Sequence, residues 1–140
     1  MGIRSFFFGI VIVILAGCSH AIDALPPLSD KFSDIQQQTF NRSCNGPSCH
    51  DAITQKSLLC LAPDSSYNQL MHHVVQQNGK AFSKLVIPGN PDSSFLVYKL
   101  TKATGDVLYG ALMPNNNTGQ IPQNQIDAII SWIRRGAPND

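Results

Sequence analysis

The feature that most constrains this chain is a cluster of two cysteines and a histidine, Cys44, Cys49 and His50. An Asn-Gly-Pro sequence at positions 45–47 separates the cysteines and favours a tight turn. In an exported protein, two thiols this close could form a disulfide that closes a small loop. A disulfide gives no reason for a histidine directly after the second cysteine. The cluster therefore favours a site in which both thiols and the imidazole act on one bound group.

The rest of the chain shows helical periodicity without sustained strand alternation, which predicts an all-α domain with long loops. Residues 41–49 and 104–119 are expected to be loops, and 88–91 a hard turn. Because long loops leave a small domain short of core, such a chain usually wraps a group that completes it. Four helices are expected. The first is Ser29–Phe40, capped by Ser29 or Asp30. The second is capped by Ser65 or Ser66 and ended by Asn78-Gly79, and its apolar face carries Tyr67, Leu70, Met71, Val74 and Val75. The third is a short helix capped by Asp92 or Ser93 that runs through Leu100, and the last runs from Pro122 to Gly136 and buries Ile126, Ile129, Ile130 and Ile133.

The spacing of the cysteines and the histidine suits covalent attachment of a haem. C-x-x-C-H is the signature of c-type haem attachment, and this chain has the longer spacing C-x4-C-H. The two thiols add across haem vinyl groups, and the imidazole reaches the iron. The second cysteine must adjoin the histidine, because their two attachments share one edge of the ring. The first cysteine can lie further away where the intervening loop bulges, as Asn-Gly-Pro allows.

Four segments together resemble class I-like bacterial c-type cytochromes, monohaem proteins in which C-x4-C-H is a minority variant. The segments are Cys44–His50; Pro88–Leu100, similar to P-G-x-P-x-x-S-x-L-x-x-K; Met113-Pro114; and Ile130–Ala137, similar to I-x-x-W-I-x-x-G-A. The four segments lie between Cys44 and Ala137, within a resemblance that covers Phe32 to Ala137, nearly the whole expected domain. Their order and spacing carry the resemblance more than any one of them.

The resemblance implies a cytochrome c-like domain of about four helices, with long loops wrapped around one covalently attached haem c. It implies thioether bonds to Cys44 and Cys49, and His50 and Met113 as the iron ligands. The second ring nitrogen of His50 would donate to a backbone carbonyl, and Pro88 is the expected acceptor. Six-coordinate iron leaves no place for a substrate. The implied function is therefore one-electron transfer to redox partner proteins through small transient interfaces, without enzymatic catalysis.

Other interpretations stay open at this point. Attachment could run through Cys49 alone. A five-coordinate haem sensor or enzyme would have Met113 off the iron. If Met113 is not the ligand, His72 and His73 are the substitutes.

A haem-free structural lipoprotein with a Cys44–Cys49 disulfide is a further alternative. If Cys18 is acylated and Cys44 and Cys49 hold haem, Cys60 has no partner in the chain and is expected to be a small buried hydrophobe. Alternatively, Cys60 bonds Cys44 if Cys44 escapes haem. Trp132 is expected in the core, where it packs the last helix against the first.

The N-terminus predicts export and lipid anchoring. Arg4 precedes an apolar run, Ser5–Gly17, which is shorter than the roughly 20 residues of a membrane-spanning helix and fits a secretory signal. Leu15-Ala16-Gly17-Cys18 resembles the lipobox of bacterial lipoproteins, which implies cleavage before Cys18 and its acylation; an ordinary cleaved signal is the alternative. Residues 1–17 are then signal peptide, 18–28 linker and 29–140 the domain. The resemblance implies a protein lipid-anchored in the periplasm or outer membrane of a bacterium, with the lipid membrane as partner through Cys18.

Length and charge exclude other classes of protein. A chain of 140 residues suits one domain. Lys and Arg number 10 and Asp and Glu 9, so no basic surplus exists to bind a nucleic-acid backbone. Every acidic residue is Asp, which excludes a Glu-based acid or metal ligand. The net charge of +1 also indicates that electrostatics do not strongly steer partner contacts.

Overall fold

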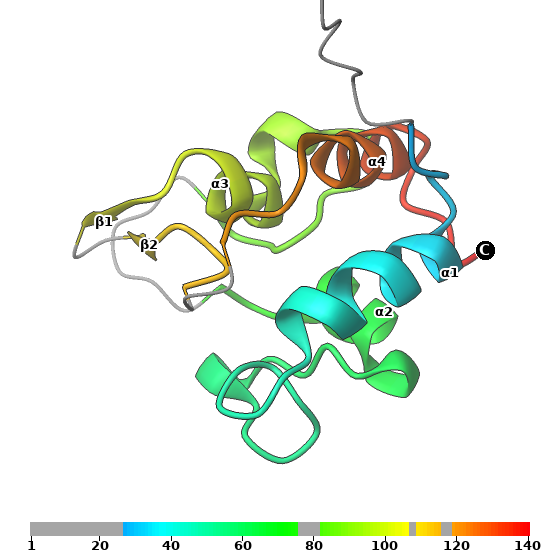
Figure 1. Cartoon of the computed structure of the whole chain (residues 1–140). Coiled ribbons are helices and arrows are strands. Elements are labelled where there is room, and N and C mark those ends of the chain that lie inside the picture. The colour runs from blue at the N-terminus through cyan, green and yellow to red at the C-terminus, as the bar shows by residue number, and fades with distance from the viewer. Residues whose placement is uncertain (1–26, 76–81, 107–108, 116–118) are drawn as a thin grey trace, which may run out of the picture.

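The computed structural model describes residues 27–75, 82–106, 109–115 and 119–140 (Figure 1). Within these residues the chain is mostly helical, with four α-helices and one short two-stranded sheet. The predicted helical domain is confirmed at this level. The predicted signal peptide, Cys18 and the Asn78-Gly79 helix end lie outside the described residues. No helix in the described ranges has the length and apolar character needed to cross a membrane.

The first helical segment starts later and runs further than predicted. α1 (Phe32–Ile35) continues directly into a wider π-helix, η1 (Gln36–Cys44), so residues 41–44 of the predicted loop are helical. The predicted caps at positions 29 and 30 do not form. Instead, the Asp140 side chain accepts the Phe32 amide proton at 2.9 Å, and its main-chain carbonyl accepts that of Ser33 at 2.8 Å. A contact between residues distant in sequence therefore fixes the start of α1.

α2 (Pro63–His72) begins and ends earlier than predicted. Proline lacks an amide proton and has a helical φ, which suits Pro63 to the first helical position. Ser66, one of the predicted caps, is buried inside the helix and donates to a side-chain oxygen of η1 at 2.5 Å. The helix stops before Val74, whose side chain is 67% exposed. The predicted apolar face is therefore correct as far as Met71, which packs against the core, and wrong at Val74.

A 3₁₀ turn, η3 (Pro91–Ser93), leads into α3 (Phe95–Thr101). The predicted turn and short helix are confirmed, but the predicted cap is wrong. The side chain of Asn90 accepts the Ser93 amide proton at 3.1 Å and caps η3. The N-cap of α3 is Ser94, which makes no side-chain capping bond.

Residues 104–119 were expected to be loop, yet they include a hairpin. β1 (Thr104–Asp106) pairs antiparallel with β2 (Gly110–Ala111). The described residues stay mostly helical, so the all-α prediction holds and only the predicted loop is wrong here. Strands this short contain too few residues to show an alternating pattern in the sequence, so pairing depends on the neighbouring structure.

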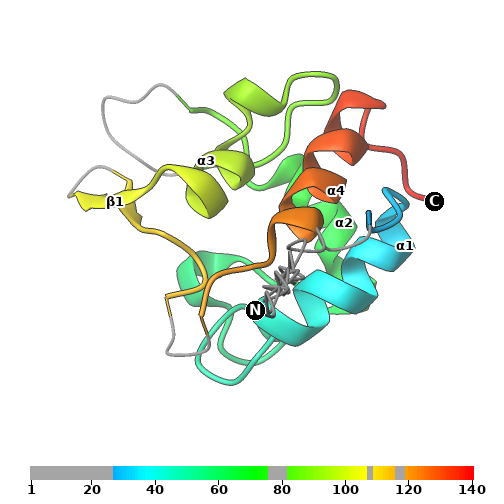
Figure 2. The same ribbon diagram turned by 45° about the horizontal axis from the view of Figure 1, so that its top comes forward.

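α4 (Gln123–Arg134) lies between α3 and α1, and contacts both, while η1 contacts α2 (Figures 1 and 2). Trp132 is fully buried, and its ring centre is 5.2 Å from that of Phe32. The predicted packing of the last helix against the first is therefore confirmed. The predicted buried face of α4 is also confirmed at Ile126, Ile129 and Ile133, while Ile130 is only partly buried.

Candidate functional site

The segment Cys44–His50 forms a closed loop at the end of η1. Cys44 is the last residue of η1. Its carbonyl accepts the amide proton of His50 at 3.1 Å, and the Gly46 carbonyl accepts that of Cys49 at 3.0 Å. These bonds bring the main chain of the first cysteine beside the histidine despite the long spacing. The loop has the turned-back shape that its Asn-Gly-Pro sequence predicts.

The chain after His50 folds back and braces this loop. The Cys49 carbonyl accepts the Lys56 amide proton at 2.9 Å, and the His50 carbonyl accepts the Leu61 amide proton at 2.7 Å. Lys56 begins a 3₁₀ turn, η2 (Lys56–Leu58). The main chain of the motif is therefore held from both sides, by η1 and by the returning segment.

Four residues in and after the loop have positive φ without being glycine. They are Ser48 (67°), Gln55 (42°), Ser57 (59°) and Leu58 (60°). A side chain makes this left-handed conformation costly, and such residues concentrate at functional sites. This local strain is a second indication that the Cys44–Leu58 region is shaped for binding.

The imidazole of His50 is held in one orientation by a main-chain carbonyl. Its Nδ1 lies 3.3 Å from the carbonyl oxygen of Leu59. A carbonyl only accepts, so Nδ1 carries the proton and Nε2 keeps the lone pair that a metal ligand needs. The predicted acceptor Pro88 is wrong. Pro88 is exposed and lies in a turn. This turn contacts α4, because the amide of Gly89 donates to the Ile133 carbonyl at 2.7 Å.

Burial lowers the pKa of His50 below its ordinary value. Hydrogen bonds to main-chain carbonyls oppose this effect, and the positive charges of His73 and Lys99 add to it. A lowered pKa keeps the ring neutral at physiological pH, which is the form that can bind a metal. His50, His73 and Lys99 therefore share one electrostatic neighbourhood.

The thiols of Cys44 and Cys49 are both half-buried and free, and so is the thiol of Cys60, which is buried. Burial raises the pKa of Cys44 to about 12, and the nearby Cys49 contributes to the same shift. Cys44 also packs against the hydrophobic core. The structure thus brings Cys44, Cys49 and His50 together on one loop. The prediction that Cys60 is a buried hydrophobe is confirmed, since its exposed fraction is 5%.

Met113 lies on the segment that follows β2. It is half-buried, packs against the core and donates its amide proton to the Lys99 carbonyl of α3 at 2.8 Å. The charge of Lys99 also contributes, after burial and the charge of His73, to the lowered pKa of His50. Lys99 therefore connects the Met113 segment with the surroundings of His50.

The two histidines of the predicted reserve ligand pair have different environments. His72 is exposed, and its Nδ1 lies 3.0 Å from the Asn68 carbonyl of its own helix. His73 is half-buried, and its positive charge contributes to the lowered pKa of His50. Of the two histidines, His73 is therefore the one that interacts electrostatically with the loop.

Sequence reasoning overlooked an aromatic cluster beside the Met113 segment. Its members are Phe82, Phe95, Tyr98 and Tyr109, and every pair of ring centres lies 4.9 to 6.3 Å apart. All but Phe95 are half-buried, so the cluster offers apolar contact surface at the edge of the core. The spacing of Phe95 and Tyr98, three apart on α3, is the signal that could have revealed it.

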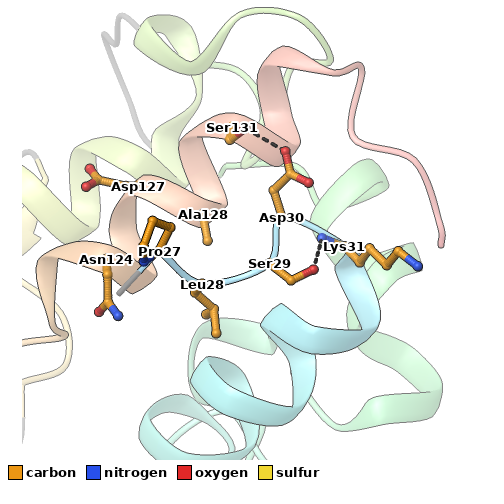
Figure 3. Close-up of a pocket in the computed structure, with 9 residues that line it drawn as sticks. All are labelled: Pro27, Leu28, Ser29, Asp30, Lys31, Asn124, Asp127, Ala128 and Ser131. Atoms are coloured by element: carbon orange, nitrogen blue, oxygen red, sulfur yellow. Dashed lines mark hydrogen bonds between the residues drawn. The ribbon is translucent and has the colours of Figure 1, made fainter. Parts of the chain in front are cut away.

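A pocket lies elsewhere, between the N-terminal segment and α4 (Figure 3). It is lined by residues such as Leu28, Asp30, Asn124 and Ser131, and none of its lining residues belongs to the predicted site. The Asp30 carboxylate accepts a hydrogen bond from Ser131 at 2.6 Å and pairs with Arg135 at 3.2 Å. These contacts give Asp30 a structural role in holding the N-terminal segment against α4.

No family model, curated protein or solved structure matches this chain. Over the ranges that the structure describes, no group of three or more His, Cys, Asp or Glu side chains could hold a metal ion. The features that indicate a function are therefore the geometry of the Cys44–His50 loop and the position of the Met113 segment.

Proposed function

We propose that this protein is a monohaem c-type cytochrome that carries single electrons. Thioether bonds would join haem c to Cys44 and Cys49, with His50 and Met113 as the iron ligands. The observation that carries the proposal is the closed loop, which gathers two free thiols and an imidazole whose Nδ1 faces the Leu59 carbonyl. This donor set fits covalent haem, because it offers two thiols for vinyl groups and one nitrogen lone pair for iron.

Each residue of the site would have a distinct part in this function. Haem, when bound, supplies a one-electron redox centre. The Leu59 carbonyl orients His50 and makes Nε2 the ligand atom. A thioether sulfur from Met113 would stabilise ferrous iron and raise the reduction potential. Because both axial positions are then filled, electron transfer at the exposed haem edge fits the site better than catalysis.

The predicted N-terminal signal extends the proposal to location and partners. Cleavage before Cys18 and its acylation would anchor the domain to a membrane, in the periplasm or outer membrane of a bacterium. Redox proteins in that compartment would then be its partners. The linker of residues 18–28 would connect the anchor to the domain.

The test is chemical and counts the attachments directly. The mature protein, produced with a c-type maturation system, is unfolded in urea and alkylated, and its peptides are weighed. Haem should remain bound after acid–acetone extraction, and Cys60 should be alkylated while Cys44 and Cys49 are protected. Labelling of Cys44 alone besides Cys60 would mean attachment through Cys49 only. A colourless protein two hydrogens lighter than its sequence mass would contradict the proposal and indicate a Cys44–Cys49 disulfide.

The axial ligand is tested by comparing two methionine variants. Met113 and Met71 are both half-buried and both pack against the core. M113A should abolish the methionine–iron charge-transfer band of the ferric protein and open the iron to imidazole. M71A should change neither property. A wild-type spectrum for M113A would exclude Met113 as the ligand and favour a different sixth ligand or five-coordinate iron.

A further inference from the structure

Lys99 contacts the segment that carries Met113 through both its side chain and its main chain. Its Nζ donates to the carbonyls of Tyr109 (2.8 Å) and Ala111 (2.5 Å), which flank Gly110. Its own carbonyl accepts the Met113 amide proton at 2.8 Å. One residue of α3 thus contacts this segment at three points, two through the side chain and one through the main chain.

The glycine between the two acceptors provides the main-chain conformation that this contact uses. Gly110 has φ of +68°, a conformation that side chains disfavour. A Cβ at this position would lie 3.4 Å from Nζ, an ordinary contact distance, so the main-chain conformation and not the lack of a side chain is what requires glycine. Glycine therefore suits a position whose two flanking carbonyls both accept from the ammonium.

The ammonium lies at the edge of the aromatic cluster, 6.0 Å from the centre of the Phe95 ring. A cation over an aromatic face is attracted to it. The carbonyls and the ring together hold a positive charge in a half-buried position. The positive charge of Lys99 is also among the smaller causes of the lowered pKa of His50.

From these contacts we infer that Lys99 is a positioning residue, which holds segment 109–113 so that Met113 would stay on the haem iron. The inference rests on the proposed function. Charge-assisted hydrogen bonds are stronger than neutral ones, so the two that Lys99 donates to the carbonyls of Tyr109 and Ala111 would restrain the segment strongly. A methionine ligand raises the reduction potential of haem iron, so a segment that lets Met113 leave the iron would lower that potential.

The experiment compares K99M with K102M in the mature holoprotein. Lys102 follows the end of α3 and is exposed, which makes it the matched control. Three quantities are measured: hydrogen exchange of the amides of residues 109–115, the rate of imidazole binding to ferric iron, and the reduction potential. K99M should raise the first two by about tenfold or more and lower the third. K102M should match the wild type in all three.

The outcomes separate this inference from the proposed function on which it rests. If M113A opens the iron to imidazole but K99M behaves like K102M, the role of Lys99 is refuted and the proposed function stands. If M113A has no effect, Met113 is not the ligand, and both fail together. If K99M does not fold, K99Q and K102Q take their places, and equal behaviour of these two would refute the inference. A purely structural role for Lys99 would speed hydrogen exchange yet leave the reduction potential unchanged.

Discussion

In the folded, haem-free protein, the Cys44 thiol should resist alkylation. Burial raises its pKa from the ordinary 9.0 to about 12. Only the thiolate is nucleophilic, so the reactive fraction at pH 8 falls by about a thousandfold relative to an ordinary cysteine. The cause is the position of Cys44 at the end of η1, where the side chain packs against the core. A thiolate of higher pKa is a better nucleophile, which offsets part of this loss, so the alkylation rate should fall by more than about tenfold.

The assay follows iodoacetamide labelling of Cys44 at pH 8 by peptide mass, in the folded chain and in the same chain in urea. The unfolded chain supplies the reference rate for an exposed thiol. A C49S variant is the control for the second cause of the shift. Because burial is the larger cause, Cys44 should stay slow in C49S. A folded-state rate within about tenfold of the urea rate would refute the reasoning, because it would mean that Cys44 is solvated and the loop open.

Three further predictions concern the framework that holds the site. Ile129→Ala should lower the unfolding free energy by about 2–5 kcal/mol, since the side chain is fully buried, whereas Ile53→Ala, at a side chain 94% exposed, should change it by less than about 0.5. Trp132→Phe should cost about 1–3 kcal/mol, because the indole N–H donates to a main-chain carbonyl at 2.8 Å. Urea unfolding measures these changes. The hydrogen bond from the Phe32 amide holds the pKa of Asp140 below its ordinary 3.8. The Asp140 carboxylate should therefore stabilise the folded protein fully above pH 3.8, and this stabilisation should be lost as the pH falls through the lowered pKa. Asp140→Asn should flatten this acid limb of the stability curve.

Each of these predictions has a clear contrary result. Equal losses for the two isoleucine variants would contradict the assigned core. An unchanged unfolding midpoint for Trp132→Phe would mean that its hydrogen bond adds nothing to stability. An acid limb that is identical in Asp140→Asn and wild type would show that this carboxylate does not cap α1.

Local patterns predicted the parts of the fold that local physics controls. The buried face of α4 follows from apolar spacing alone, because one face of a helix repeats every three to four residues. The turn before α3 was also predictable, because proline and glycine restrict the main chain wherever they occur. Of the candidate site, Cys44, Cys49 and His50 were predicted from residue type and spacing, and Met113 from the resemblance to c-type cytochromes.

The tertiary structure decided what depends on partners distant in sequence. α1 starts where Asp140 caps it, so no residue near Ser29 could have revealed that boundary. The carbonyl facing His50 belongs to Leu59, since the returning chain places it there and every residue has a carbonyl to offer.

Lys99 shows the same division between sequence and structure. Its place in the Pro88–Leu100 segment was plain from the sequence, but its three contacts with the Met113 segment were not. By itself, the sequence determined which side chains have the chemistry that the proposed haem attachment needs and which helices can form, because residue chemistry and periodicity are local properties. Only the tertiary structure determined how those side chains are held, because hydrogen bonds between distant segments exist only once the chain has folded.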